Sequence, residues 1–227
     1  MEEIVQGGLY LVSTPIGNLG DITYRAVDVL KRVGLIAAED TRKSKILCNH
    51  YKIDTPLTSY HSYNLQKETG RLVEKLQNGL SVALISDAGT PGISDPAYQL
   101  VVECKNRNIP VIPVPGASAL LAALVVSGLQ THKFVYEGFL PLKKGRKSRL
   151  EFLAQETRTM VFYESPHRIQ KTVKEMLEYF GDRSCTMGRE ITKKFEEFFR
   201  GKLSKLLEHL SGKNVKGEIV LVVEGKL

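Results

Sequence analysis

The chain has 227 residues, enough to bury a substantial core in one large domain or two small ones. Its hydrophobic content of 42% and charged content of 25% are typical of a folded protein and exclude a disordered one. The longest uninterrupted apolar run, residues 119–126, is too short to cross a bilayer. Two glutamates follow Met1 where a signal peptide is basic, and the three cysteines form no CxxC pair. We therefore expect a cytoplasmic protein with reduced thiols, no metal and no membrane association.

The positive charge is concentrated in the second half of the chain. Residues 1–115 carry 12 basic and 12 acidic side chains, whereas residues 116–227 carry 20 and 13. The second half therefore holds the whole formal net charge of +7. This asymmetry is compatible with a polyanionic partner and equally with a solvated basic surface.

The first half alternates strand and helix patterns. Apolar strands are predicted at residues 9–12, 34–40, 82–86 and 109–116. Helices are predicted from Asp21, as N-cap, to Gly34, through Leu65, Leu72 and Leu76 up to Gly79, and over residues 96–105. Because these strands are apolar throughout, we expect a parallel sheet with helices on both of its faces.

From Gly116 the pattern changes. A buried helix is predicted at residues 118–128, a strand at 157–164, a helix at 165–180 and a last strand at 217–225. Fewer of these strands are separated by helices, which favours a mixed or antiparallel sheet. The sequence thus predicts two α/β domains, residues 1–115 with a parallel sheet and residues 116–227 with a mixed sheet.

Three loops rich in glycine and proline follow predicted strands, at residues 13–21, 86–96 and 113–119. Ligands of α/β sheets bind beyond the carboxyl ends of the strands, and glycine lets the backbone approach them closely. The chain lacks both G-x-G-x-x-G and G-x-x-x-x-G-K-[ST], the two common phosphate-binding loops. A nucleoside without phosphates, such as S-adenosylmethionine, fits this pattern. The alternative is that the loops are tight turns of a compact fold.

Seven ordered motifs carry a family resemblance that runs from about Leu9 to Gly225: LVSTPIGNLGDIT, AAEDTR, ALISDAGTPGISDP, PVPGASA, GFLP, FYESPHRI and GREITKKFEE. With these motifs the chain resembles the tetrapyrrole-methylase superfamily, and within it the bacterial branch that 2′-O-methylates a cytidine of small-subunit ribosomal RNA. SDAGTPGISDP together with YESPHR is particular to this branch, because the corresponding loop of porphyrin-building relatives reads more like GGDP.

The resemblance implies an S-adenosylmethionine site in a cleft between the two domains, a homodimer, and small-subunit (16S) ribosomal RNA or the assembled small subunit as substrate. It implies cofactor contacts by Pro15, Ser86, Asp87, Ala88, Gly89, Thr90, Ile93, Ser94, Ala117, Ser118, Tyr163, Met187 and Gly188. Some members continue beyond the point where this chain ends, so we expect any RNA contact of such an extension to be absent.

Methyl transfer from a sulfonium is an in-line displacement, and a base that removes the ribose hydroxyl proton would assist it. The candidates are four carboxylates near the predicted strand ends: Glu39, Asp40, Asp87 and Glu164. We predict that Asp40 or Glu164 is the base. Each has a structural alternative. Asp40 can pair with Arg42, Glu164 with Arg168, and catalysis by positioning alone needs no base.

Residues 143–149 carry five cations, and we call them the basic segment. We predict that Lys143, Lys144, Arg146 and Lys147 contact RNA phosphates and that Arg42 and Arg168 reach the acceptor nucleotide. The alternative is a solvated charged face. Phe195 is expected in the core or in a dimer contact. Two other functions fit the sequence less well: a small-molecule methylase acting on a tetrapyrrole, and an RNA-binding module that has lost methyl transfer.

Overall fold

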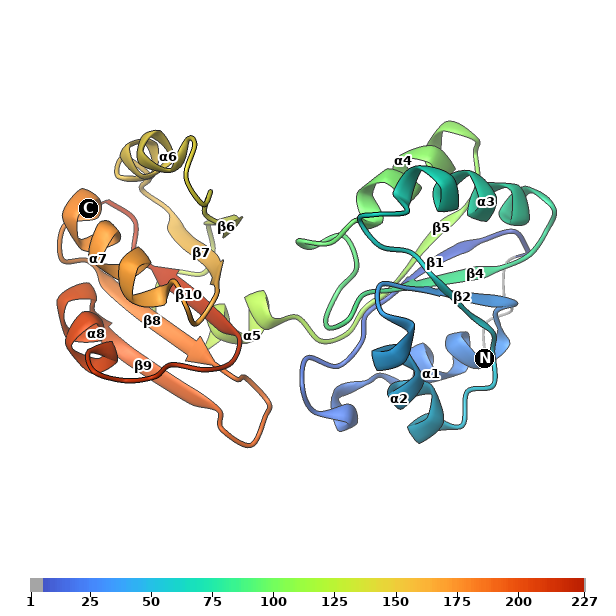
Figure 1. The fold of residues 1–227 in the computed structure, drawn as a ribbon, viewed down its shortest axis with the longest axis horizontal. Helices are drawn as coiled ribbons and strands as arrows, with labels where there is room; N and C mark the ends of the chain where they lie inside the picture. Colours follow the sequence, from blue (N-terminus) through green and yellow to red (C-terminus); the bar gives the residue numbers. More distant parts are fainter. Residues whose placement is uncertain (1–5, 227) are drawn as a thin grey trace. The chain divides into compact units, whose positions relative to one another are not determined.

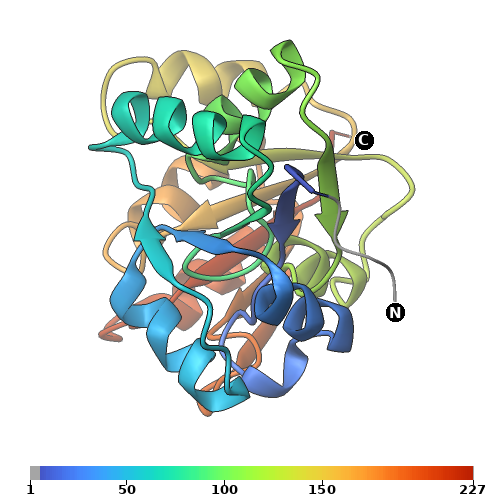
Figure 2. The same cartoon turned by 90° about the vertical axis from the view of Figure 1, so that its right-hand side faces the viewer.

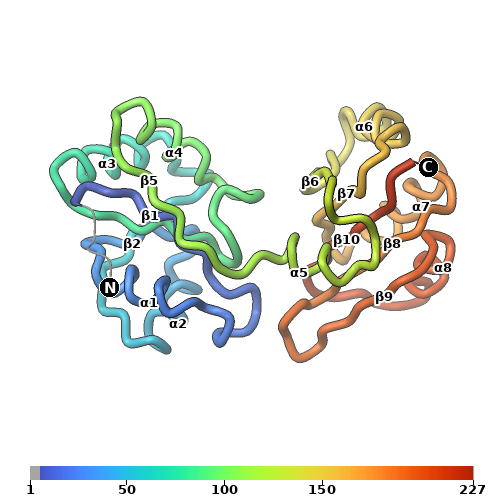
Figure 3. The backbone as a smooth tube through the Cα atoms, turned by 180° about the vertical axis from the view of Figure 1, so that it is seen from behind, coloured from blue at the N-terminus to red at the C-terminus, as the bar shows by residue number. Residues whose placement is uncertain are grey.

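The structure is a computed structural model that describes residues 6–226 of the chain. The chain divides into two compact units, Met1–Ser118 and Ala119–Leu227, each built around its own five-stranded sheet (Figure 1). We call them unit 1 and unit 2. The chain passes once from the first to the second, between β5 and α5 (Figure 3).

The sheet of unit 1 is parallel throughout. Its strands are β1 (Leu9–Val12), β2 (Leu35–Ala38), β3 (Leu57–Ser59), β4 (Val82–Ile85) and β5 (Val111–Val114), in the order β3-β2-β4-β1-β5. In β1, which lies between β4 and β5, Leu9 lies opposite Val82 on one side and Val111 on the other. Since all strands point the same way, their carboxyl ends meet at one edge of the sheet. The predicted parallel sheet is confirmed.

Helices cover both faces of this sheet. Helices α1 (Tyr24–Arg32) and α2 (Thr41–Tyr51) pack on one face, and α3 (Leu65–Gln77) and α4 (Ala97–Asn106) pack on the other (Figures 1 and 2). A short 3-10 helix, η1 (Leu19–Asp21), precedes α1. The N-cap of α1 is Thr23, whose hydroxyl accepts a hydrogen bond from the Ala26 N–H at 3.1 Å. The expected N-cap, Asp21, belongs to η1 instead.

The sheet of unit 2 is mixed, as predicted. Its strands are β6 (Phe134–Phe139), β7 (Thr159–Glu164), β8 (Ser184–Arg189), β9 (Glu197–Lys202) and β10 (Ile219–Val223), in the order β6-β7-β10-β8-β9. Strands β6 and β7 are parallel, whereas the other three pairs are antiparallel.

Three helices of unit 2 share one core with one face of this sheet: α6 (Arg146–Leu153), α7 (Ile169–Phe180) and α8 (Leu203–Leu210). Helix α5 (Ala119–Val125) lies at the other face, where the Leu120 N–H donates to the Tyr163 hydroxyl at 3.3 Å. This helix is only partly buried, because Leu121 and Val125 are 49% and 69% exposed. The prediction of a buried helix here was therefore wrong for its outer side.

Residues 6–226 contain no helix that is long and apolar enough to span a membrane. All three cysteines are buried and unpaired. Within the same range, no three or more His, Cys, Asp or Glu side chains are grouped so that they could hold a metal ion.

Candidate functional site

The three glycine- and proline-rich loops meet at the carboxyl edge of the unit 1 sheet. Thr14 and Gly89 exchange two backbone hydrogen bonds, of 2.9 and 3.0 Å, which tie the first loop to the second. The Ser13 and Thr90 hydroxyls lie 3.0 Å apart, and the Thr90 hydroxyl donates to the Ala117 carbonyl of the third loop at 3.2 Å. The loops are thus fixed to one another rather than being independent turns.

Glycines at this edge occupy positions that disfavour a side chain, by backbone conformation or by lack of space. Gly89 and Gly92 have φ angles of +79° and +94°, in the left-handed region that favours glycine. A Cβ on Gly116 would lie 2.9 Å from the Ser13 Cβ, closer than real Cβ atoms approach. The Asp95 carboxylate accepts from the Gly92 N–H at 2.7 and 2.8 Å and from the Ala97 N–H at 2.9 Å, which holds the second loop in shape. The edge therefore presents backbone and small side chains in a fixed arrangement.

The unit 1 residues predicted to contact the cofactor all lie on these loops. Ser86 and Gly89 are buried, Ala88, Ile93 and Ser94 are exposed, and the others are partly buried: Pro15, Asp87, Thr90, Ala117 and Ser118. The Ser86 hydroxyl donates to the Ala88 carbonyl at 3.2 Å. Their contact with the cofactor stays a prediction, which this shared location favours.

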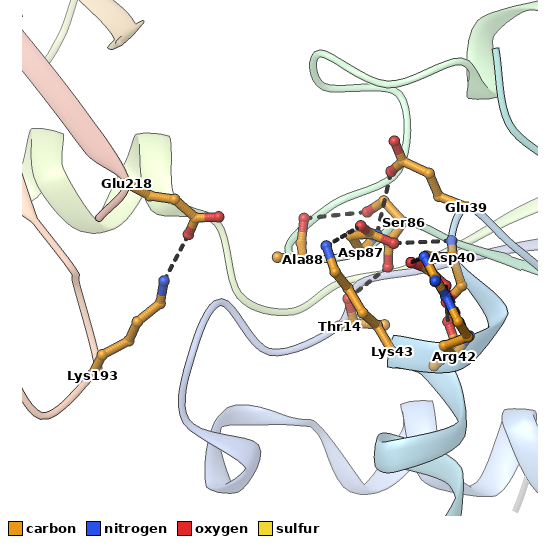
Figure 4. A network of polar contacts seen from close by, with 11 residues as sticks. Thr14, Glu39, Asp40, Arg42, Lys43, Ser86, Asp87, Ala88, Lys193 and Glu218 are labelled. Carbon is orange, nitrogen blue, oxygen red and sulfur yellow. Dashed lines mark hydrogen bonds and ion pairs between the residues drawn. The ribbon is translucent and has the colours of Figure 1, made fainter. Parts of the chain in front are cut away.

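A charged network lies beside the loops (Figure 4). The Asp87 carboxylate accepts from the Asp40 N–H at 3.0 Å and from the Lys43 ammonium at 2.6 Å. Asp40 is the N-cap of α2 and accepts from the Arg42 N–H at 2.9 Å and from its guanidinium at 2.8 and 3.0 Å. Sequence reasoning missed Lys43. The signal was available, because an N-cap at Asp40 places Lys43 in the first turn of the helix, beside the strand ends.

These contacts favour the structural alternative for Asp40. The hydrogen bonds from Arg42 hold the pKa of the Asp40 carboxyl well below its usual range, which makes it a weak base. Burial raises the pKa of neighbouring Glu39, and the negative charge of Asp87 raises it further. One Glu39 oxygen accepts a long hydrogen bond, 3.4 Å, from the Asp87 N–H. Among the carboxylates of this edge, Glu39 is the one better suited to accept a proton.

The three unit 2 residues predicted at the cofactor site do not share one face. Tyr163 and Gly188 both lie opposite Val220 of β10, whereas Met187 lies opposite Leu221. The Met187 side chain is buried in the core beneath α7 and α8, so only its backbone is available for the predicted contact. Burial raises the pKa of Tyr163 to about 12, so its hydroxyl stays protonated at neutral pH.

Glu164, the second predicted base, is enclosed in a buried network. It is 2% exposed and accepts from the Arg168 guanidinium at 2.9 and 3.0 Å, from the Thr172 hydroxyl at 2.6 Å and from the Ser165 N–H at 2.7 Å. These donors occupy the lone pairs of both carboxylate oxygens. The predicted catalytic role is therefore not retained, and Arg168, bound to Glu164 and to the Leu140 carbonyl at 2.9 Å, is not free to reach a nucleotide.

The basic segment is not uniform. Lys143, Lys144 and Lys147 are exposed, in keeping with the predicted RNA contact. Arg146 is only 6% exposed and donates to Glu175 at 2.8 Å, to the Thr172 hydroxyl at 2.7 Å and to the Pro141 carbonyl at 3.0 Å. Because its guanidinium is buried and bonded to these three acceptors, we leave Arg146 out of the RNA-binding surface.

Comparisons with known proteins agree with this fold. The family model of the Tetrapyrrole (Corrin/Porphyrin) Methylases matches residues 8–207. The ribosomal RNA small subunit methyltransferase I of Synechocystis is 52% identical over 221 residues, covering 96% of this chain and 79% of that protein. The Thermotoga maritima protein of the same name is 48% identical over 97% of this chain and 99% of its own length. The chain belongs to the tetrapyrrole methylases and, within them, to the family of proteins named ribosomal RNA small subunit methyltransferase I.

Solved structures with low sequence identity share the fold. A cobalt precorrin-4 methyltransferase superposes with a TM-score of 0.71 at 17% identity, over 96% of this chain and 95% of its own. A diphthine synthase gives 0.72 at 14% identity, over 95% and 89%. The fold is therefore shared by enzymes named for different substrates, and the substrate has to be argued from the site and the nearer relatives.

Proposed function

We propose that the protein transfers a methyl group from S-adenosylmethionine to the 2′-hydroxyl of a cytidine ribose in small-subunit (16S) ribosomal RNA. The observation that carries this proposal is the interlocked set of three loops at the carboxyl edge of the unit 1 sheet, in a chain 48–52% identical to proteins named for methylation of this RNA. A uroporphyrin-III C-methyl transferase of the same fold, 18% identical, has been solved in complex with S-adenyl homocysteine.

The residues at the edge fit S-adenosylmethionine. Bound there, the cofactor supplies an electrophilic methyl group. The second loop, residues 86–96, offers backbone donors and acceptors, and the close approach of Gly116 to Ser13 leaves no room for a side chain between the first and third loops. Asp87, which already bonds the Lys43 ammonium at 2.6 Å, and Glu39 make this edge acidic, which would suit the positive charges of the cofactor. The chain's own task is to hold the acceptor oxygen in line with the methyl group, and Glu39 is placed at this edge to take its proton.

The RNA strand is expected to meet exposed cations of unit 2. Lys143, Lys144 and Lys147 supply three of them, in the half of the chain that carries the whole net charge. A tetrapyrrole substrate would not require this surface. We therefore favour RNA over a small-molecule acceptor.

We also propose that the protein acts as a homodimer in the cytoplasm. Outside the β8–β9 hairpin, four large apolar side chains of unit 2 are more than half exposed, as expected of a surface that pairs with a second copy: Val125, Phe139, Leu142 and Phe152. The three buried, unpaired cysteines suit a reducing compartment. Sedimentation equilibrium tests the dimer, and a mass of one chain, 25.3 kDa, would contradict it.

Transfer of labelled methyl groups from S-adenosylmethionine tests the proposed activity. The acceptors are small ribosomal subunits that lack the modification, naked small-subunit RNA, and a uroporphyrin-type tetrapyrrole. Label in either RNA sample supports the proposal and shows whether RNA or the assembled particle is read. Label only in the tetrapyrrole favours the small-molecule methylase. Cofactor binding without transfer to any acceptor favours an RNA-binding module.

A further inference from the structure

Unit 2 contains a cavity of about 280 Å³ that the cofactor loops do not form. It lies between the hairpin that joins β8 to β9 and the segment that follows α8, at the orange strands and helix of Figure 1. Buried Met187 and Leu210 form its apolar floor. The volume is close to the lower end of the range for small-molecule pockets, roughly 300–1,000 Å³. It suits a ligand of about one nucleotide.

The rim of the cavity is cationic. Arg189, Lys213 and Lys216 line it, and Glu197 is the single carboxylate among its lining residues. Glu197 is already engaged, because it accepts from the Arg189 guanidinium at 2.8 and 2.9 Å and lies 2.7 Å from the His209 Nε2. The cavity therefore offers more positive charge than its own acid neutralises.

Two ammonium groups at the rim are available to an anion. Lys213 and Lys216 are exposed, and the Lys213 ammonium contacts only the ring nitrogens of His209, at 3.2 and 3.4 Å, among the residues that the structure describes. Over the same residues, no carboxylate pairs with the Lys216 ammonium, although its backbone carbonyl accepts from Arg189 at 3.1 Å. This arrangement suits a phosphate at the rim.

Phe195 stands at the cavity with 66% of its surface exposed. The sequence predicted it in the core or in a dimer contact, and the core is excluded. The Lys194 ammonium lies 5.6 Å from the centre of the ring, so a base would stack on the ring in place of this cation or on its other face. An exposed aromatic ring at a cavity with cations at its rim is the usual platform for nucleotides of a single strand, in which the base stacks and the phosphate pairs.

The hairpin that carries Phe195 is held in place by its neighbours. Glu190 and Thr192 have φ angles of +51° and +69°, an uncommon conformation for residues with a side chain. The Lys193 ammonium bonds the Glu190 carboxylate at 2.8 Å and the Glu218 carboxylate at 2.9 Å, the second contact being drawn in Figure 4. The exposed ring is therefore presented by an ordered turn, which reduces the entropy lost when a base stacks on it.

We propose that this cavity binds one nucleotide of a single-stranded segment of the RNA substrate, with its base on Phe195 and its phosphate between Lys213 and Lys216. The proposal rests on the proposed function, because that function makes RNA the ligand. It adds a second point of attachment for the strand, in addition to the exposed lysines of the basic segment.

The chain has no tryptophan, which allows a direct test. In Phe195→Trp, the single indole reports on this cavity alone. A 12-nucleotide single-stranded oligoribonucleotide of mixed sequence is expected to quench its fluorescence, while an abasic oligomer with the same phosphates binds without quenching. In anisotropy titrations of the same labelled RNA, Phe195→Ala should weaken binding about tenfold, as expected for the loss of one stacked base.

Charge substitutions test the phosphate contact. The double variant Lys213→Ala/Lys216→Ala should reduce the slope of log affinity against log salt by about 0.7, because the two lysines share one phosphate and each single-strand phosphate contact contributes about 0.7. The matched control is Lys67→Ala/Lys105→Ala, which removes two exposed lysines of α3 and α4. It should leave both the affinity for RNA and the salt slope within about twofold of the wild-type values. Circular dichroism of each variant verifies the fold.

The fluorescence and affinity measurements either support the nucleotide site or overturn it. An unquenched Phe195→Trp, together with unchanged affinity of Phe195→Ala, overturns the proposal even if the protein methylates RNA. Quenching without any methyl transfer to RNA supports the cavity and rejects the proposed function. Equal quenching by free cytidine monophosphate and by the oligomer, with equal affinity, would show a mononucleotide site and overturn the assignment to a strand.

Discussion

Replacing Glu164 by glutamine separates a structural role from a catalytic one. The glutamine keeps the shape of the side chain, but it removes the negative charge that pairs with the Arg168 guanidinium. It also replaces one oxygen, which accepts a hydrogen bond from a group such as the Thr172 hydroxyl, by an NH2 group that can only donate. Removing one partner of a fully buried ion pair costs about 3–5 kcal/mol. The Arg168 side chain keeps 24% exposure, so water compensates part of this loss and we expect about 3 kcal/mol. For a chain of this length, the loss lowers Tm by roughly 6–12 °C.

Thermal unfolding followed by circular dichroism measures this loss in Glu164→Gln. The control is Glu178→Gln on helix α7, whose carboxylate is exposed and which should change stability by less than about 0.5 kcal/mol. Methyl transfer is then measured well below the lowered Tm, where we expect most of the activity to persist. A Tm equal to that of the wild type together with lost methyl transfer would refute the structural role and restore Glu164 as the base.

Three further predictions concern other parts of the chain. Gly116→Ala places a Cβ 2.9 Å from that of Ser13 and should weaken S-adenosylmethionine binding about tenfold in calorimetry, whereas Gly70→Ala, with open space around it in α3, should bind normally. Alanine at all three exposed lysines of the basic segment should lower the salt slope of RNA binding by about 2, while Arg146→Ala lowers Tm instead; the reverse pattern would contradict the assignment. The Arg158 hydrogen bonds lower the pKa of Glu156 from 4.5 to about 2, so this carboxylate stabilises the fold above about pH 4.5 and less as the pH falls towards 2. The Tm deficit of Glu156→Gln should therefore be constant from pH 5 to 7 and shrink below that range, and a deficit that grows on acidification would reverse the sign of this linkage.

The architecture was predictable because its signals are local. Strands that are apolar throughout, such as β4, indicate burial on both faces, and the loops after them carry glycines whose positive φ angles the structure shows. The start of α1 was misplaced because Asp21 and Thr23 are both good N-caps. The choice depended on η1, which takes up Asp21.

The site residues were harder to predict because their roles depend on distant partners. Arg146 looks like its neighbours in sequence, but the side chains that bury it, Thr172 and Glu175, lie 26 and 29 residues away. Glu164 and Arg168 are four residues apart, so their pairing was an available alternative, while the hydroxyl of Thr172 that completes the network was not visible in the sequence. Phe195 was expected in the core or in a dimer contact. The sequence did not show that the ion pairs of Lys193 with Glu190 and Glu218 fix the hairpin that presents it at the surface.

The proposed activity is tested most directly by nucleoside analysis of the methylated RNA. Small subunits that lack the modification are incubated with the protein and S-adenosylmethionine, and the RNA is digested to nucleosides for mass spectrometry. We expect one new 2′-O-methylcytidine per subunit and no base-methylated nucleoside. Methylation on a base, or on the ribose of another nucleotide, would contradict it.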